Sequence, residues 1–482
     1  MMAGEYKFQS RRAEWRYKLK AFESHSAIAL ILSLGLCSTA NATEVAPGNA
    51  PAPGKVEEPV AVPALNPPVT RAPFFGGDVS TGAAQRASSA GYELTGAGIG
   101  SASVPEQGAI LTRSAPGRPV RFQNGIFVYP SASLSVGHND NVGGDSRNEK
   151  ASKIVVLRPD VLAELKTRGD RYTLSYSGNY GRYTSSADDN FNHHDIWLAG
   201  DNYFTTRARM GWGVGYQMRT DARGSTDRGA ASTEPDKWRA PLARVIAMYG
   251  APGALGRIEL ESSLMQKRYT NNRTTTRGSD VDIAVLAGRF FYRIMPKTSL
   301  IFEARHTWND YTLRTSLNDN AYTKLLFGAT WDMAAKTSGD IRLGRAYKNF
   351  DSSRMRDPRG GTWEAGLTWA PLTYSVFRID TAQDFADSTG VGNFIENRSY
   401  NLAWTHQWAS IMSSSVTAGV VKTDYDGVAR KDNTRNFGVS VYRDLSYNFR
   451  AGLSWTRTKR DSNQVNLDFR RDVFMLTLDA ML

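Results

Sequence analysis

The chain has 482 residues, with 59 Lys and Arg against 47 Asp and Glu, and a formal net charge of +12 at pH 7. Its mean hydropathy of -0.43 excludes a bundle of transmembrane helices, since each helix would need about 20 consecutive apolar residues. The basic residues form no long block of like charge, so nucleic acid is not an expected partner. The only cysteine is Cys37, which excludes disulfides and Cys-based zinc sites in the rest of the chain.

Residues 1–42 are expected to be a cleaved secretory signal peptide. A basic segment precedes the apolar run Ala27 to Cys37, which is too short to anchor the chain across a bilayer. Ala40-Asn41-Ala42 then matches an A-x-A cleavage site. Cys37 could instead carry a lipid, but Leu36 before it is larger than the residue usual at that position. Cleavage after Ala42 predicts an exported mature chain without cysteine.

Residues 43–118 are expected to form a Pro/Ala/Gly-rich periplasmic linker. This segment holds more than half of the 19 prolines of the chain, with small residues between them. Such a composition buries too little apolar area to offset the entropy of ordering, which predicts a largely disordered segment. We expect a passive tether, and the alternative is a docking arm for a partner. The third predicted region is residues 119–482.

From about Pro119 onward, apolar and polar residues alternate and no helical period is sustained. In the stretch Met210 to Met218, apolar bulk occupies the even positions, and Gly or Gln occupies the odd ones. Each stretch of this kind predicts a β-strand with one apolar face and one polar face.

The connections between these stretches alternate in length. Eight short turns, such as those at 168–170, 370–372 and 409–410, alternate with nine longer polar loops. This alternation predicts 18 strands, with both ends of the barrel on the side of the short turns. The long loops are expected near 139–150, 184–193, 221–236, 270–280, 311–321, 350–361, 386–395, 425–435 and 460–466.

Short turns on one side, long loops on the other and aromatic residues beside the short turns are typical of bacterial outer-membrane barrels. We therefore predict an all-β fold, a single transmembrane antiparallel up-and-down β-barrel of about 18 strands, in the outer membrane of a Gram-negative cell. A soluble β-sandwich or propeller is the alternative. The C-terminal stretch from Phe474 has a hydrophobic residue at every second position and resembles the signal read by the barrel-assembly machinery, although Leu482 replaces the usual terminal aromatic.

Two segments resemble a known family. The strand Gly125 to Val136 followed by Asn139-Asp140-Asn141-Val142, and the module Trp369 to Val376, are similar to the "putative β-barrel porin 2" family of outer-membrane proteins. The resemblance covers about residues 119–482. It implies a role beside exopolysaccharide or capsule export systems, in which some members supply the outer-membrane pore. The implied partners are the polysaccharide and a periplasmic polysaccharide export protein.

The sequence predicts neither an enzyme nor a metal or cofactor site. His193 and His194 are adjacent on a strand, so they point to opposite faces and cannot chelate one metal ion. The acidic clusters 139–141 and 188–190 could bind calcium, but solvated loops are the expected interpretation. The other histidines of the predicted barrel stand singly on separate strands, where wall positions are expected, and they are His138, His306 and His406.

The polar faces of the strands are expected to line the lumen. Most of the net charge of the chain falls in residues 119–482, which favours an anionic solute such as an acidic polysaccharide. The same residues could instead form salt bridges that brace the wall, and the excess charge could face anionic lipid or lipopolysaccharide. The lumen-lining candidates are Arg209, Gln217, Arg219, Arg257, Glu259, Glu261, Glu303, Arg305, Asp340, Arg342, Arg378, Asp380 and Arg450.

Three functions are compatible with these observations. The first is an outer-membrane conduit for a secreted exopolysaccharide or capsular polysaccharide, because about 18 strands leave room for a polar channel. The second is a general or anion-preferring diffusion porin. The modest length of the longest loop, Asp221 to Lys237, favours the conduit, because porins fold a long loop inward as a constriction. The third is a structural or adhesive barrel.

Overall fold

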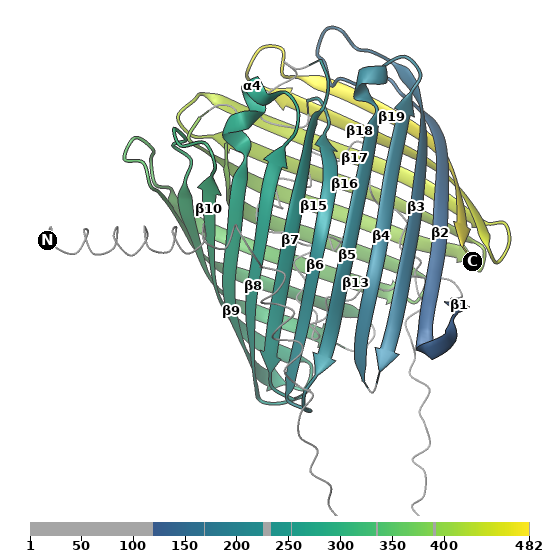
Figure 1. Cartoon of the computed structure of the whole chain (residues 1–482), viewed down its shortest axis with the longest axis vertical. Coiled ribbons are helices and arrows are strands. Elements are labelled where there is room, and N and C mark those ends of the chain that lie inside the picture. The colour runs from purple at the N-terminus through teal and green to yellow at the C-terminus, as the bar shows by residue number, and fades with distance from the viewer. Residues whose placement is uncertain are drawn as a thin grey trace, which may run out of the picture. The chain divides into compact units, whose positions relative to one another are not determined.

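A closed β-barrel accounts for nearly all of the described chain. The computed structural model describes residues 119–481 apart from 168, 225–232, 252, 334–335 and 389–391. Eighteen long antiparallel strands, β2 to β19, follow one another around the barrel, and β19 pairs with β2 to close it (Figure 1). The predicted fold class and strand number are confirmed. The predicted signal peptide and linker, 1–42 and 43–118, lie outside the described residues.

All eighteen long strands have 13 to 16 residues, more than the roughly 10 that a tilted strand needs to cross a bilayer. The strand bounds are β1 Val120–Arg121, β2 Ile126–Asn139, β3 Ser152–Thr167, β4 Asp170–Tyr183, β5 Phe191–Tyr203, β6 Ala208–Asp221, β7 Asp236–Tyr249, β8 Gly256–Tyr269, β9 Val281–Met295, β10 Thr298–Tyr311, β11 Asn320–Met333, β12 Thr337–Phe350, β13 Arg359–Leu372, β14 Ser375–Asp387, β15 Phe394–Ala409, β16 Met412–Tyr425, β17 Arg430–Asp444, β18 Phe449–Ser462 and β19 Phe469–Met481.

Among the described residues, helical structure is confined to single turns. One lies before β2 and the others lie in long loops, and no helix of the described residues is long and apolar enough to cross a membrane. The helical segments are η1 Gln123–Gly125, η2 Ala187–Asp189, α4 Arg273–Thr276 and η3 Arg277–Ser279.

Two of the expected connections differ from the structure. The loop expected at 425–435 is a tight connection of 426–429, because residues from Arg430 onward already pair with β16. Gly427, with φ of 79°, makes this tight connection feasible in a conformation that favours glycine. The turn expected at 370–372 lies at 373–374, because β13 continues to Leu372. In both places strand pairing extends further than the sequence pattern indicated, to Arg430 in β17 and to Leu372 in β13.

The two faces of the barrel wall have the reverse polarity of a soluble β-protein. Leu260 and Leu453 point outward, with 57% and 61% of their surface exposed, whereas Glu259 and Ser263 on the opposite face are fully buried. An exposed belt of this kind is favourable only against hydrocarbon, so it marks the part of the wall that faces lipid.

Aromatic side chains gather on the outer face near the short turns. Tyr249 and Trp408 are among the most exposed, at 60% and 58%. Trp369, Phe377 and Trp404 form a stacked row across β13, β14 and β15, with ring centroids 5.2 Å and 6.0 Å apart. Amphipathic rings favour the headgroup level of a membrane, so this row marks an interface at the short-turn end.

The glycines of β6 make room for a buried tryptophan. Trp197 of β5 lies on the inner face over Gly213 and Gly215 of β6, and a Cβ atom at either glycine would clash with its indole. The indole in turn packs against Trp238 and Leu242 of β7. Gly213 and Gly215 therefore serve inner packing.

We expect Gly213→Leu to destabilise the barrel by roughly 1 to 3 kcal/mol, because the new side chain must displace Trp197. The measurement is the temperature at which the folded, fast-migrating form of the purified protein is lost in gel electrophoresis. The control is Val214→Leu on the lipid-facing side of the same strand. Equal unfolding temperatures for both variants would contradict the packing role of Gly213.

The topology predicts opposite labelling of the two barrel ends. In outer-membrane barrels the long loops face the cell surface and the short turns face the periplasm. We expect Ser353→Cys, in the loop after β12, to react with a membrane-impermeant maleimide added to whole cells. Ser446→Cys, in the turn after β17, should react only after the outer membrane is permeabilised. The reverse result would invert the assigned orientation.

Candidate functional site: the inner wall of the barrel

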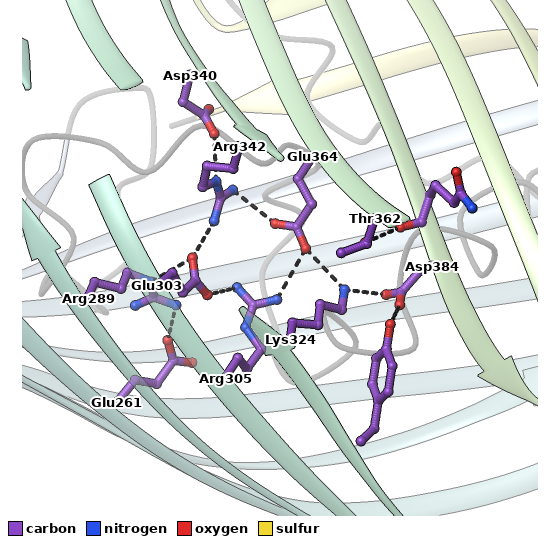
Figure 2. Close-up of polar contacts among 12 residues, drawn as sticks. Glu261, Arg289, Glu303, Arg305, Lys324, Asp340, Arg342, Thr362, Glu364 and Asp384 are labelled. Carbon is purple, nitrogen blue, oxygen red and sulfur yellow. Dashed lines mark hydrogen bonds and ion pairs between the residues drawn. The ribbon is translucent and has the colours of Figure 1, made fainter. Parts of the chain in front are cut away.

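Charged side chains from neighbouring strands converge on one part of the inner wall (Figure 2). Arg342 of β12 reaches Glu303 of β10, and Arg305 of β10 reaches Glu364 of β13. Side chains two or three strands apart can meet only on the concave side of a curved sheet, because on the convex side they diverge. These residues therefore point into the barrel.

Glu303 is the centre of this cluster. Its carboxylate accepts a hydrogen bond from Arg342 Nη1 at 2.6 Å and a short one from Arg305 Nη2, and Arg289 Nε lies 3.5 Å away (Figure 2). The Glu303 side chain is fully buried. A buried carboxylate is tolerated only with strong partners, and here three guanidinium groups surround it.

The cluster extends toward β14 through Glu364 and Lys324. Glu364 lies 3.1 Å from both Arg342 Nη2 and Lys324 Nζ. Lys324 Nζ also donates to Asp384 Oδ2 at 2.6 Å, and the Tyr322 hydroxyl donates to the other oxygen of Asp384. Lys324 of β11 thus joins carboxylates of β13 and β14.

The opposite end of the cluster lies on β7, β8 and β9. Arg289 Nη2 donates to Glu261 Oε2 at 2.6 Å, and Arg244 Nε donates to Glu261 Oε1 at 2.9 Å. Glu259 lies 3.5 Å from Arg257 Nη2 and 3.8 Å from Arg289 Nη1. Eight adjacent strands, β7 to β14, are thereby linked on their inner side.

This charged wall is electrically balanced. It contains as many cations as carboxylates, and each of its charges contacts at least one opposite charge, so it supplies no positive excess to the lumen. We define the charged wall as Arg244, Arg257, Glu259, Glu261, Arg289, Glu303, Arg305, Lys324, Asp340, Arg342, Glu364 and Asp384.

Seven of the thirteen lumen-lining candidates belong to the charged wall, and the sequence analysis missed five of its members. The missed residues lie on the same inner face as the candidates, at positions that pair with or neighbour them on adjacent strands. Arg289, for example, stands directly opposite both Glu259 and Glu303. Extending the register across each short turn would have found it. The missed members are Arg244, Arg289, Lys324, Glu364 and Asp384.

Four further candidates lie in separate ion pairs on the inner face. Arg219 pairs with Asp195 at 2.9 Å, and Arg378 with Asp380 at 3.2 Å. Both arginines are more accessible than any arginine at the centre of the charged wall. Arg450 pairs with an aspartate of β19 at 3.0 Å and is buried.

The last two candidates lie on β6. Arg209 is placed over the ring of Tyr203 at 5.5 Å, near a short turn. Gln217 is buried directly opposite Asp195. Neither residue contacts the charged wall in the described structure.

A second part of the inner wall, on β15 to β18, is neutral and polar. Between its two ends, every inner position on these strands is uncharged. Asn401 and Thr417 are exposed to the lumen, which shows that the passage is open beside them. We call the following residues the hydroxyl wall: Asn401, Ser413, Ser415, Thr417, Ser440, Ser454 and Thr456.

The base of the loop between β6 and β7 turns inward at the long-loop end. Arg460 of β18 donates from Nη1 to the carbonyl oxygen of Gly224 at 2.9 Å, although β18 and β6 are not neighbours in the barrel. Arg223 donates to both oxygens of Asp189, at 2.7 Å and 2.5 Å, and this pair raises the pKa of the arginine. The longest loop, expected to be modest in length, thus begins by reaching inward to β18.

The residues considered for calcium or metal binding are occupied by protein contacts. Asp189 holds Arg223, and the carbonyl oxygen of Asn141 accepts from Arg471 at 2.7 Å. His193 contacts Thr220, whereas His194 contacts tyrosines on the outer face. Within the part of the chain that the structure describes, no group of three or more His, Cys, Asp or Glu side chains could hold a metal ion.

Residues 116–481 match the family model described as "Putative beta-barrel porin 2". The chain belongs to this family. It is therefore a porin-like barrel of the outer membrane, as the resemblance of the strand pattern implied. A comparison with curated proteins gave no match.

Solved structures similar to this porin-family barrel include porins and a secretin. A "bacterial polysaccharide outer membrane secretin" is 10% identical, covers 72% of this chain and 97% of its own, and has a TM-score of 0.33. Pseudomonas aeruginosa OccK3 is 14% identical, with 74% and 96% covered and a TM-score of 0.43. A BenF-like porin from Pseudomonas fluorescens Pf-5 is 10% identical, with 74% and 99% covered and a TM-score of 0.45.

We expect Glu303→Gln to destabilise this porin-family barrel by about 3 to 5 kcal/mol, because it leaves buried guanidinium groups without their carboxylate. The measurement is again the temperature at which the folded form is lost. Glu234→Gln is the control, since it breaks an accessible pair with Lys237 at 2.9 Å, where exposed pairs contribute little. A Glu303→Gln variant as stable as the control would show that the charged wall does not brace the barrel.

Proposed function

We propose that this barrel is the outer-membrane conduit through which a secreted exopolysaccharide or capsular polysaccharide leaves the cell. The observation that carries the proposal is the division of the inner wall into a neutralised charged wall and a neutral hydroxyl wall. In the charged wall, each charged side chain is paired with an opposite charge of the same wall. The hydroxyl wall leaves hydroxyl and amide groups accessible to the passage.

A hydroxyl wall suits a polysaccharide because a sugar presents hydroxyl groups on every side. Ser, Thr and Asn side chains both donate and accept hydrogen bonds, so they can exchange partners as a polymer slides past. Weak, replaceable contacts permit passage, whereas strong ion pairs would hold a polymer in place. A barrel of 18 strands also belongs to the size class that leaves an aqueous channel.

The charged wall has a supporting role in this proposal. The cationic preference expected from the sequence depends on accessible arginines, and Arg305 and Arg342 are buried in ion pairs. Arg209, Arg219 and Arg378 are the candidate arginines outside the charged wall that remain partly accessible. Any preference for an acidic polymer would therefore come from these three residues. A periplasmic polysaccharide export protein is the proposed partner at the short-turn end.

A general diffusion porin is the second candidate function. The contact between Arg460 and Gly224 favours it, because porins narrow their channel with a loop folded into the barrel. The two functions predict different phenotypes. Deleting the gene should stop polysaccharide secretion if the barrel is a conduit, and should slow the uptake of small solutes if it is a porin.

We expect the double variant Asn401→Trp with Thr417→Trp to reduce secretion of polysaccharide, because two indoles would narrow the passage at its open wall. The measurement is total polysaccharide in the medium of a deletion strain complemented with the variant. The same purified variant should show a lower single-channel conductance in planar bilayers.

The matched control is Leu402→Trp with Ala418→Trp, on the same two strands but facing lipid. This control should secrete and conduct like the wild type. Normal secretion by the deletion strain, together with lost uptake of small solutes, would reject the conduit in favour of the porin.

A further inference from the structure

Three cations stand side by side on the outer face of β17, β18 and β19. Arg435 lies directly opposite Lys459, and Lys459 lies directly opposite Arg470. All three side chains are exposed. Like charges placed directly opposite each other destabilise a sheet, so folding by itself disfavours this cationic row, defined as Arg435, Lys459 and Arg470.

Nearby carboxylates compensate the row only in part. Lys459 Nζ lies 2.7 Å from Asp461, and Arg470 Nε lies 3.6 Å from Asp472. Asp472 also accepts hydrogen bonds from Nε and Nη2 of Arg457, at 2.8 Å and 3.0 Å. Arg435 forms no ion pair with the described residues. With Arg457 included, four cations face two carboxylates, and the surface keeps a positive charge.

An apolar surface continues from the row toward the short turns. Trp455 lies between Phe437 and Phe474, with ring centroids 5.7 Å and 6.2 Å away. Phe437 and Phe474 are exposed, and so are Leu453 and Leu476 further along the same strands. We call this surface the aromatic strip. It lies within the lipid-facing belt, whereas the cationic row lies at the edge of that belt nearest the long loops.

The order of charge and apolar surface matches one kind of molecule, an amphiphile with anionic head groups above several acyl chains. We propose that the cationic row and the aromatic strip bind a phosphorylated glycolipid of the outer leaflet, the lipid A part of lipopolysaccharide. Its phosphates contact the row, and its acyl chains lie against the strip. The long-loop end faces the cell surface in barrels of this class, which is the leaflet that contains this lipid.

This site is independent of what passes through the barrel, because it lies on the outer face. A free phosphate ion could contact the row but would gain nothing from the strip. An acidic polysaccharide at the cell surface could contact the row but would likewise gain nothing from the apolar strip. Bisphosphorylated lipid A can contact both surfaces. Its two phosphates also match a row of three cations, whereas a single phosphate would leave part of the positive charge of the row uncompensated.

The test compares purified full-length protein with the triple variant Arg435→Gln, Lys459→Gln and Arg470→Gln. Glutamine keeps a polar, uncharged side chain at each position and removes the repulsion, so the variant should fold at least as well as the wild type. Binding is followed as the rise in unfolding temperature with added lipid A in detergent. Each cation near an anionic lipid surface contributes about fivefold, so the variant should lose on the order of 100-fold in apparent affinity.

The control variant Arg182→Gln, Arg268→Gln and Arg345→Gln removes three outer-face cations that do not form a row, and it should bind lipid A like the wild type. Dephosphorylated lipid A and inorganic phosphate are the other two probes, and neither should stabilise the protein comparably. Equal stabilisation of the wild type and the triple variant by lipid A would overturn the proposal. Stabilisation of the wild type by inorganic phosphate as strong as that by lipid A would assign the row to a free anion.

Discussion

The structure depends on one constraint, that a backbone in hydrocarbon must satisfy all its hydrogen bonds within the protein. Pairing of β19 with β2 meets this constraint, because it removes the two edges that an open sheet would leave. Closure then divides each strand into an outer and an inner face. The outer face must be apolar to meet lipid, so polar chemistry is confined to the inner face and to the ends of the strands. The charged wall and the hydroxyl wall lie on the inner face, and the cationic row lies near the strand ends, beside the apolar belt that contains the aromatic strip.

The inner face both braces the barrel and leaves the lumen open, and it does so on different strands. A wide barrel has few side chains to fill it, so its wall needs stiffness, and the ion pairs from Arg244 to Asp384 supply links between strands that are not neighbours. A buried network of this kind tolerates no missing partner. The strands β15 to β18 carry no such network, and their small hydroxyl and amide groups leave the lumen open beside Asn401 and Thr417. Bracing and passage are therefore separated around the circumference.

The outer face is likewise more than a uniform belt. Near the short turns, aromatic rings such as Trp369 and Trp404 stack into a row at the membrane interface. Near the long loops, charged residues return to the outer face, and the row of Arg435, Lys459 and Arg470 stands beside exposed aromatic rings. The strands are longer than the bilayer requires, so their ends can carry polar surface beyond the hydrocarbon. This extra length is what makes a lipid site possible on the wall itself.

The sequence by itself determined the fold class and the strand number, because these follow from a period of two and from the alternation of short and long connections. It also placed candidates such as Glu303 and Arg342 on a polar face. It could not show that these two residues touch, because they lie on strands two apart and meet only through the curvature of the closed sheet. Strand register and closure likewise decided three other features. The charged wall is balanced where the sequence favoured a cationic lumen. The loop after β6 turns inward at Gly224, and Arg435, Lys459 and Arg470 form a row. Local pattern fixes the direction of a side chain, whereas its partners depend on which strands the barrel brings together.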